Sequence, residues 1–220
     1  MSIKSQIENI LESLSDRAQL VAVSKTYPAE DILVAYDMGQ RLFGESRPQE
    51  MVAKWEALPK DIEWRMIGHL QRNKVKMIAP FVSIIESLDS ERLAVAINTE
   101  AAKCGRVIDC LLEIHVAQEQ SKSGWAYEEL EAFVRGGGFE ALSNIRVRGV
   151  MGIASNTDDE SRVRSDFESL ARCKESLAEY FTEAFDTLSM GMSDDYLLAV
   201  ECGSTSVRVG SRIFGARTYN

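Results

Sequence analysis

Lys25 is the residue of this chain with the clearest potential for covalent chemistry. It directly follows Leu20–Ser24, an apolar run of the kind that forms a strand buried on both faces. A lysine at the end of such a strand can lose part of its hydration and become a nucleophilic amine that forms an imine. The alternative is a solvated loop lysine without a chemical role.

Two short segments near the C-terminus could hold a phosphate group. They are Met190–Ser193 and Arg208–Ser211, and each contains a glycine that permits close approach of the backbone. Ser193 offers a hydroxyl, and the amides of Gly210 and Ser211 would open a helix whose N-terminus attracts an anion. The alternative is that the glycines only make tight turns and the serine only caps its helix. A phosphate cradle beside an imine-forming lysine predicts a ligand that carries both an aldehyde and a phosphate.

The elements that must position these residues alternate regularly between strand and helix. Eight apolar runs predict strands, and each is followed by residues with helical spacing, so the pattern is typical of a parallel sheet. From the first strand onward the chain allows about 25 residues for each unit, close to the lower size limit of a (β/α)₈ barrel. The expected strands are 20–24, 41–44, 62–68, 82–85, 107–114, 145–151, 187–190 and 205–209.

The expected helices begin at capping residues or prolines and mostly end at glycine or proline. An amphipathic helix over residues 1–14 precedes the first strand and is not a signal peptide. We therefore predict an α/β (β/α)₈ TIM barrel with an extra N-terminal helix, forming a single domain over residues 1–220. The alternative is an open doubly wound sheet, but its glycine-rich fingerprint is absent after the first strand. The helices that follow the eight strands are expected to start near Pro28, Pro48, Gln71, Ser87 or Asp89, Tyr127, Asp158, Ser193 and Ser211.

The barrel prediction brings the candidate residues to one place. Functional residues of such barrels lie just beyond the carboxyl ends of the strands, and phosphate frequently binds after strands seven and eight. Lys25 follows the first strand, while Ser193 and Gly210 follow the seventh and eighth. We therefore expect them at one mouth of the barrel.

Composition excludes several classes of function. The formal net charge of -9 argues against broad binding of nucleic acid or of anionic membranes, and no apolar run approaches the length of a membrane helix. Four cysteines without a C-x-x-C pair and two histidines argue against a disulfide framework and a transition-metal site. These features predict a cytoplasmic protein whose phosphate site is local.

Five motifs together resemble a known family. They are Ala22–Thr26, Phe43–Glu45, Ile67–Lys74, Leu188–Ser193 and Val207–Gly210. The chain resembles the pyridoxal phosphate homeostasis protein family, whose single-domain barrel is similar to the N-terminal domain of alanine racemase. The resemblance is collinear from about Leu20 to Tyr219.

The resemblance implies a role for each candidate residue. Lys25 would hold pyridoxal 5′-phosphate as an imine, and Ser193 with the amides of Gly210 and Ser211 would bind its phosphate. Arg208 would point into the barrel and face the pyridine nitrogen. A permanently charged guanidinium disfavours protonation of that nitrogen, so the bound ring becomes a weaker electron sink and carbanion chemistry is curtailed. From the residues alone, Arg208 is only an inward-facing residue that needs an anionic partner.

Three further residues belong to the predicted cofactor-binding set. His69 follows the third strand, Met192 lies in the motif after the seventh, and Ser46 stands where the family usually has asparagine. Packing in the core or at the rim is the alternative for Met192, and a rim histidine satisfied by a backbone partner is the alternative for His69. A second departure from the family is Arg65, which occupies a position that is usually histidine.

The function implied by the resemblance is binding of pyridoxal phosphate and its intracellular delivery to apo-enzymes that need it, by a monomer that is not an enzyme. An amino-acid racemase on the same barrel is the main alternative. It would need a second acid–base group across the cofactor from Lys25, which a second domain and a partner subunit complete in alanine racemase. A third hypothesis is a phosphosugar enzyme that forms a lysine imine with its substrate.

Overall fold

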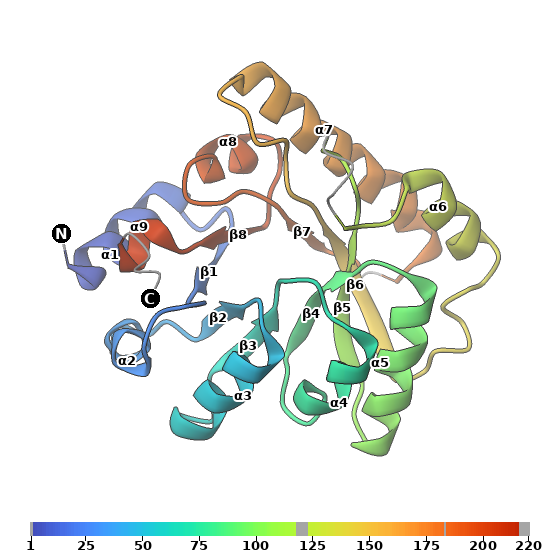
Figure 1. Cartoon of the computed structure of the whole chain (residues 1–220). Coiled ribbons are helices and arrows are strands. Elements are labelled where there is room, and N and C mark those ends of the chain that lie inside the picture. The colour runs from blue at the N-terminus through green and yellow to red at the C-terminus, as the bar shows by residue number, and fades with distance from the viewer. Residues whose placement is uncertain (1, 118–122, 183, 216–220) are drawn as a thin grey trace.

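Eight parallel strands close into a barrel that is surrounded by helices (Figure 1). The computed structural model describes residues 2–117, 123–182 and 184–215, so the last residues of the predicted domain lie outside the described part. Each strand pairs with its neighbour in sequence, and β1 closes the barrel by pairing with β8. The predicted (β/α)₈ barrel is confirmed. Its strands are β1 Gln19–Val23, β2 Leu42–Glu45, β3 Glu63–Met66, β4 Ile84–Leu88, β5 Ile108–Glu113, β6 Ile145–Met151, β7 Thr187–Ser189 and β8 Ser206–Val209.

The helices follow the strands in the expected order. An extra helix, α1, precedes β1 and contacts α2, α8 and α9, where it buries Ile7, Ile10 and Leu14. Among the described residues, no helix combines the length and the apolar composition needed to cross a membrane. The helices are α1 Ile3–Leu14, α2 Ala29–Asp37, α3 Pro48–Ala57, α4 Val75–Ile78, α5 Glu91–Lys103, α6 Tyr127–Arg135, α7 Glu160–Leu177, α8 Tyr196–Glu201 and α9 Ser211–Phe214, with 3₁₀ turns η1 Arg72–Lys74 and η2 Ala178–Tyr180.

The fourth unit differs from the sequence expectation. The strand was expected over residues 82–85 but runs through Glu86 and Ser87, and the N-cap of α5 is Ser90. Ser87 is therefore a strand residue, and the expectation that Ser87 or Asp89 caps the helix is wrong. The physical reason is that Glu86 finds cationic partners inside the barrel, so a charged residue can continue a buried strand.

Polar contacts also define the amino-terminal end of the barrel. Thr205 precedes β8, and its hydroxyl accepts a 2.8 Å hydrogen bond from the Leu188 amide. This contact joins β7 to the start of β8, at the end of the barrel opposite Lys25.

The four cysteines are free thiols, and the described residues hold no group of three or more potential metal ligands.

Candidate functional site

Lys25 lies two residues beyond the end of β1, in a short loop at the carboxyl end of the barrel. Its side chain is half-buried, and the preceding Ser24 is fully buried. The next residue, Thr26, has a φ of +72°, a left-handed conformation that is uncommon for a β-branched residue. The loop is therefore held in one unusual conformation around the lysine.

The loops after β7 and β8 are in direct contact. Ser193 is 7% exposed, and its hydroxyl oxygen accepts a 3.3 Å hydrogen bond from the Gly210 amide. Gly191 has a φ of +92°, and a Cβ atom there would lie 2.5 Å from the Ala199 Cβ atom of α8. Only glycine allows this loop to fold back over α8 and bring Ser193 to Gly210.

Gly210 also connects this pair of loops to the lysine. An ideal Cβ atom on Gly210 would lie 3.0 Å from the Val23 carbonyl oxygen, because β8 pairs with β1 up to the register Ala22↔Val209. The end of β1, two residues before Lys25, thus leaves no room for a side chain at position 210. The amide of Ser211 has no acceptor among the described residues, which leaves a donor at the same edge.

Arg208 points into the barrel, as expected. It is 4% exposed and donates hydrogen bonds to the Ser189 hydroxyl at 2.6 Å and to the Gly152 carbonyl at 2.9 Å. Its nearest carboxylate in a buried ion pair is Glu86, 3.8 Å away. Burial lowers the pKa of Arg208 from its ordinary value, although Glu86 and Glu113 act in the opposite direction. Glu86 is the anionic partner that the sequence could not identify.

Glu86 is shared between two buried guanidinium groups. Its Oε2 accepts a 2.6 Å hydrogen bond from Ser189, and its Oε1 lies 3.4 Å from Arg65. Arg65 further donates to Ser206 at 3.3 Å and to Gln19 at 3.1 Å. One carboxylate thus connects the arginine at the family's histidine position to the arginine near the mouth.

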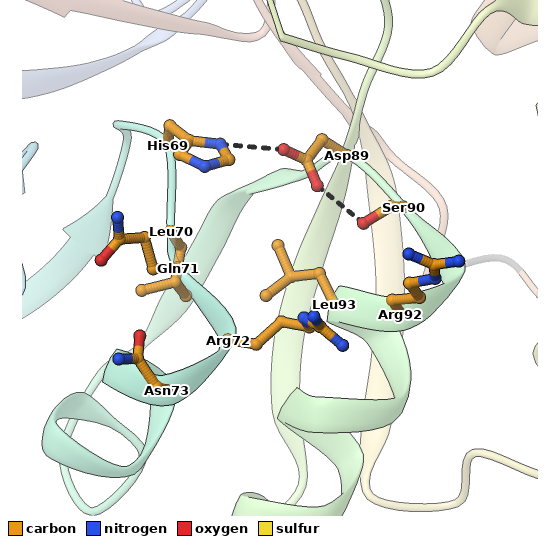
Figure 2. Close-up of a pocket in the computed structure, with 9 residues that line it drawn as sticks. All are labelled: His69, Leu70, Gln71, Arg72, Asn73, Asp89, Ser90, Arg92 and Leu93. Carbon is orange, nitrogen blue, oxygen red and sulfur yellow. Dashed lines mark hydrogen bonds and ion pairs between the residues drawn. The ribbon is translucent and has the colours of Figure 1, made fainter.

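His69 is turned toward the rim between β3 and β4. Its side chain is 61% exposed, and its Nδ1 lies 3.0 Å from the Asp89 carboxylate, which also accepts a hydrogen bond from Ser90 (Figure 2). These residues border a pocket of about 510 Å³ that Arg72 and Arg92 also line. The structure therefore gives His69 a carboxylate partner in place of the backbone partner considered above.

Ser46 and Met192 lie on two other loops of the mouth. Ser46 is half-buried and follows β2. Gly68 packs closely on Ser46, so a Cβ atom added to Gly68 would lie 2.6 Å from the Ser46 Cβ. Met192 is 41% exposed on the loop after β7, so it is not a core residue. Both residues lie on loops at the carboxyl end of the barrel, but neither side chain makes a hydrogen bond to Ser193 or Gly210 among the described residues.

A second buried carboxyl, Glu113, ends the strand that lies farthest around the barrel from β1. Its Oε1 accepts a 2.8 Å hydrogen bond from Ser123, whereas its Oε2 is buried without a partner among the described residues. Burial raises the pKa of Glu113 above its usual value. Sequence reasoning missed it, although a glutamate that ends an apolar strand is a signal for the mouth of a barrel.

Comparison with known proteins identifies the family. The family model described as "Alanine racemase, N-terminal domain" matches residues 1–218. A pyridoxal phosphate homeostasis protein of Vibrio alginolyticus is 37% identical over 100% of this chain and 99% of its own length. That of Aquifex aeolicus is 40% identical over 92% of this chain and 88% of its own. The chain belongs to the pyridoxal phosphate homeostasis protein family. The predicted resemblance is confirmed, and the family name describes control of a cofactor instead of a reaction, in agreement with the expectation that the protein is not an enzyme.

Solved structures of similar proteins share the barrel. PipY of Synechococcus elongatus with PLP bound is 33% identical, with a TM-score of 0.88 over 97% of this chain and 100% of that one. Without PLP its TM-score is 0.91 over the same shares. The alanine racemase of Bartonella henselae is only 14% identical, with a TM-score of 0.71 over 99% of this chain and 60% of the racemase, and shows the common fold alone.

Proposed function

We propose that this protein binds pyridoxal 5′-phosphate through an imine bond to Lys25 and takes part in the intracellular supply of this cofactor without turning over a substrate. The observation that carries the proposal is the packing of Gly210 against Val23. It sets the Ser193–Gly210 pair beside the loop of Lys25, so that an aldehyde and a phosphate on one small ring could be bound at once. The PLP-bound PipY relative supports the choice of ligand.

The residues present fit the chemical groups of this cofactor. A phosphate needs hydrogen-bond donors, and the Ser193 hydroxyl and the Ser211 amide would provide them at one edge of the mouth. The Gly210 amide, which donates to Ser193 Oγ in this structure, would join them when the phosphate replaces that contact. Arg208 would face the pyridine nitrogen with its buried positive charge and disfavour protonation there. The cofactor itself supplies a reactive aldehyde and an aromatic electron sink.

Three side chains would border the rest of the ring. We assign Ser46, His69 and Met192 to this role because they lie on the loops after β2, β3 and β7. His69 and Met192 are exposed in this structure, so their side chains would make contacts with the ring only when the cofactor fills the mouth. The finer parts of the proposal are a single domain over residues 1–220, a monomer in the cytoplasm, and delivery of the cofactor to apo-enzymes.

A racemase remains the second candidate because of Glu113. This carboxyl lies on the strand opposite β1 in barrel order and has an oxygen without a partner among the described residues, so it could serve as the second acid–base group. Nothing in the described part of the chain favours the phosphosugar enzyme, and the relatives support pyridoxal phosphate instead.

The test is the visible absorption spectrum of the purified protein before and after reduction with borohydride. The proposal expects an imine band that reduction removes, with the label fixed on Lys25 in peptide mass mapping. Lys25→Ala should lose the band and keep the fold, because the lysine is a half-buried loop residue. Lys103→Ala, on the exposed face of α5, is the matched control and should keep it. Label found chiefly on Lys74 or on Lys122, which lies outside the described residues, would contradict the assignment.

A further inference from the structure

A buried lysine lies beneath the loop of Lys25. Lys54 on α3 is 7% exposed, and its ammonium group donates hydrogen bonds to three oxygens. These are the Ser24 carbonyl at 2.7 Å, Glu45 Oε1 at 2.8 Å and Glu50 Oε1 at 2.6 Å. The first of these contacts holds the backbone residue immediately before Lys25.

The residue immediately after Lys25 is held by the same cluster. The Thr26 amide donates a 2.6 Å hydrogen bond to Glu50 Oε1, the same oxygen that accepts from Lys54. Thr26 adopts its left-handed conformation at this point, which is costly for a residue with a β-branched side chain. A charge-assisted hydrogen bond to the amide offsets that cost.

The cluster is anchored in rigid elements. Glu50 and Lys54 are four residues apart on α3, so they lie on one face of the helix, and Glu45 is fully buried at the end of β2. Glu45 Oε1 also accepts a 2.6 Å hydrogen bond from the Ser24 hydroxyl. Both sides of Lys25 are therefore tied to two neighbouring elements of the barrel.

We propose that Lys54 and Glu50 are positioning residues for Lys25: by fixing the backbone on either side of it, they direct its amine toward the space beside Ser193 and Gly210. Holding a nucleophile in the reactive geometry removes the entropy cost of finding it in each encounter. The inference rests on the role of Lys25 proposed above. It assigns a function to a buried lysine and a carboxylate that do not themselves border the phosphate cradle.

The experiment separates positioning from cofactor binding. Two ligands are compared: pyridoxal 5′-phosphate, whose imine formation is followed in a stopped-flow spectrometer, and pyridoxine 5′-phosphate, which has no aldehyde and reports only on the cradle. In Glu50→Gln we expect the rate of imine formation to fall about tenfold, the effect of one charge-assisted hydrogen bond, with the affinity for pyridoxine phosphate unchanged. Lys54→Met should behave alike, Lys54→Arg should recover part of the rate, and Lys103→Met is the control.

A measurement on the cofactor-free protein tests the inference independently of cofactor binding. Hydrogen exchange of the Thr26 amide should be about tenfold faster in Glu50→Gln than in the wild type, because the amide loses its charged acceptor. Glu50→Gln decides the matter if Lys54→Met fails to fold. Wild-type imine rates in Glu50→Gln, an equal loss of affinity for both ligands, or unchanged Thr26 exchange would overturn the inference. Imine formation that persists in Lys25→Ala would instead refute the proposed function.

Discussion

Gly210, which directly follows β8, and Val23 at the end of β1 lie so close that a Cβ atom on Gly210 would be 3.0 Å from the Val23 carbonyl oxygen and 3.2 Å from the Val23 Cβ. Gly210 has a φ of −123°, so backbone strain does not require glycine at this position. The requirement is space between two strand ends, one of which leads to Lys25 and the other to the candidate phosphate donors. A side chain at position 210 must therefore displace one strand end relative to the other.

Gly210→Ala is therefore expected to weaken binding of pyridoxal phosphate, and Gly210→Val to weaken it further. A Cβ contact of 3.0 Å is tighter than ordinary packing, so β1 and β8 must separate at their carboxyl ends. Ser211→Ala is the matched change, and it should bind normally because the proposal uses the Ser211 amide and not its exposed hydroxyl. Titration of the apo-protein with cofactor measures all three affinities.

Ser193→Ala should lower the affinity for the cofactor by about ten- to a hundredfold. The reason is the loss of one hydrogen bond to a charged phosphate, worth roughly 1.5–3 kcal/mol. Ser143→Ala, an exposed serine before β6, is the control and should leave affinity unchanged. The phosphate cradle would be misplaced if Ser193→Ala and Gly210→Val both kept the wild-type affinity.

Glu86→Gln tests the buried charges inside the barrel. It removes the carboxylate that lies 3.4 Å from Arg65 and 3.8 Å from Arg208 and leaves both guanidinium groups buried without their anionic partner. Breaking such a pair from one side costs about 3–5 kcal/mol, which urea unfolding would measure as a lower free energy of unfolding. Glu8→Gln on the exposed face of α1 should change it by less than about 0.5 kcal/mol. Equal free energies of unfolding for the two variants would show that the Glu86 carboxylate does not stabilise the fold through these arginines.

Glu45 predicts a specific pH dependence of stability. Burial raises the pKa of Glu45 from 4.5 to about 7, in spite of the opposing effect of Lys54. The folded protein then binds this proton more tightly than the unfolded chain, so the free energy of unfolding falls as the pH rises through that window. At about 1.4 kcal/mol for each pKa unit, the loss is about 3 kcal/mol.

The comparison that isolates this group is wild type against Glu45→Gln, unfolded by urea at several values between about pH 4.5 and 7.5. The variant should lose less stability than the wild type over this range, because its amide does not titrate while every other group is shared. Parallel profiles for the two proteins would mean that Glu45 stays charged throughout and that Lys54 outweighs burial.

The barrel and its mouth were predictable because their signals are local. Strand and helix periodicity gave eight units in order, and the residues that follow each apolar run necessarily meet at the carboxyl ends. Lys25, Ser193 and Gly210 could therefore be assigned to one region from spacing alone. The packing of Gly210 on Val23 could not, because it depends on the register between the first and last strands.

The charged partners inside the barrel were not predictable for a different reason. Glu86 interrupts an apolar run, and a charged residue in that position indicates the end of a strand unless its partners are known. Those partners, Arg65 and Arg208, come from β3 and β8, far away in sequence. The contacts of Lys54 were not predictable for the same reason. Its helical spacing to Glu50 is visible in the sequence, but its contact with the Ser24 carbonyl depends on the tertiary fold.

The last prediction concerns turnover, and it depends on Arg208 and Glu113. A buried guanidinium facing the pyridine nitrogen would weaken the electron sink, so a substrate carbanion would gain little stabilisation from the ring. Glu113 is the group on the opposite strand that could return a proton, but its Oε1 is held by the Ser123 hydroxyl. We therefore expect negligible loss of chirality and negligible Cα–H exchange when the holo-protein is incubated with L-alanine or L-serine in deuterated water. Glu113→Gln should leave these rates unchanged. Rapid exchange with racemisation that disappears in both Lys25→Ala and Glu113→Gln would make the protein a racemase with these two residues as its acid–base pair.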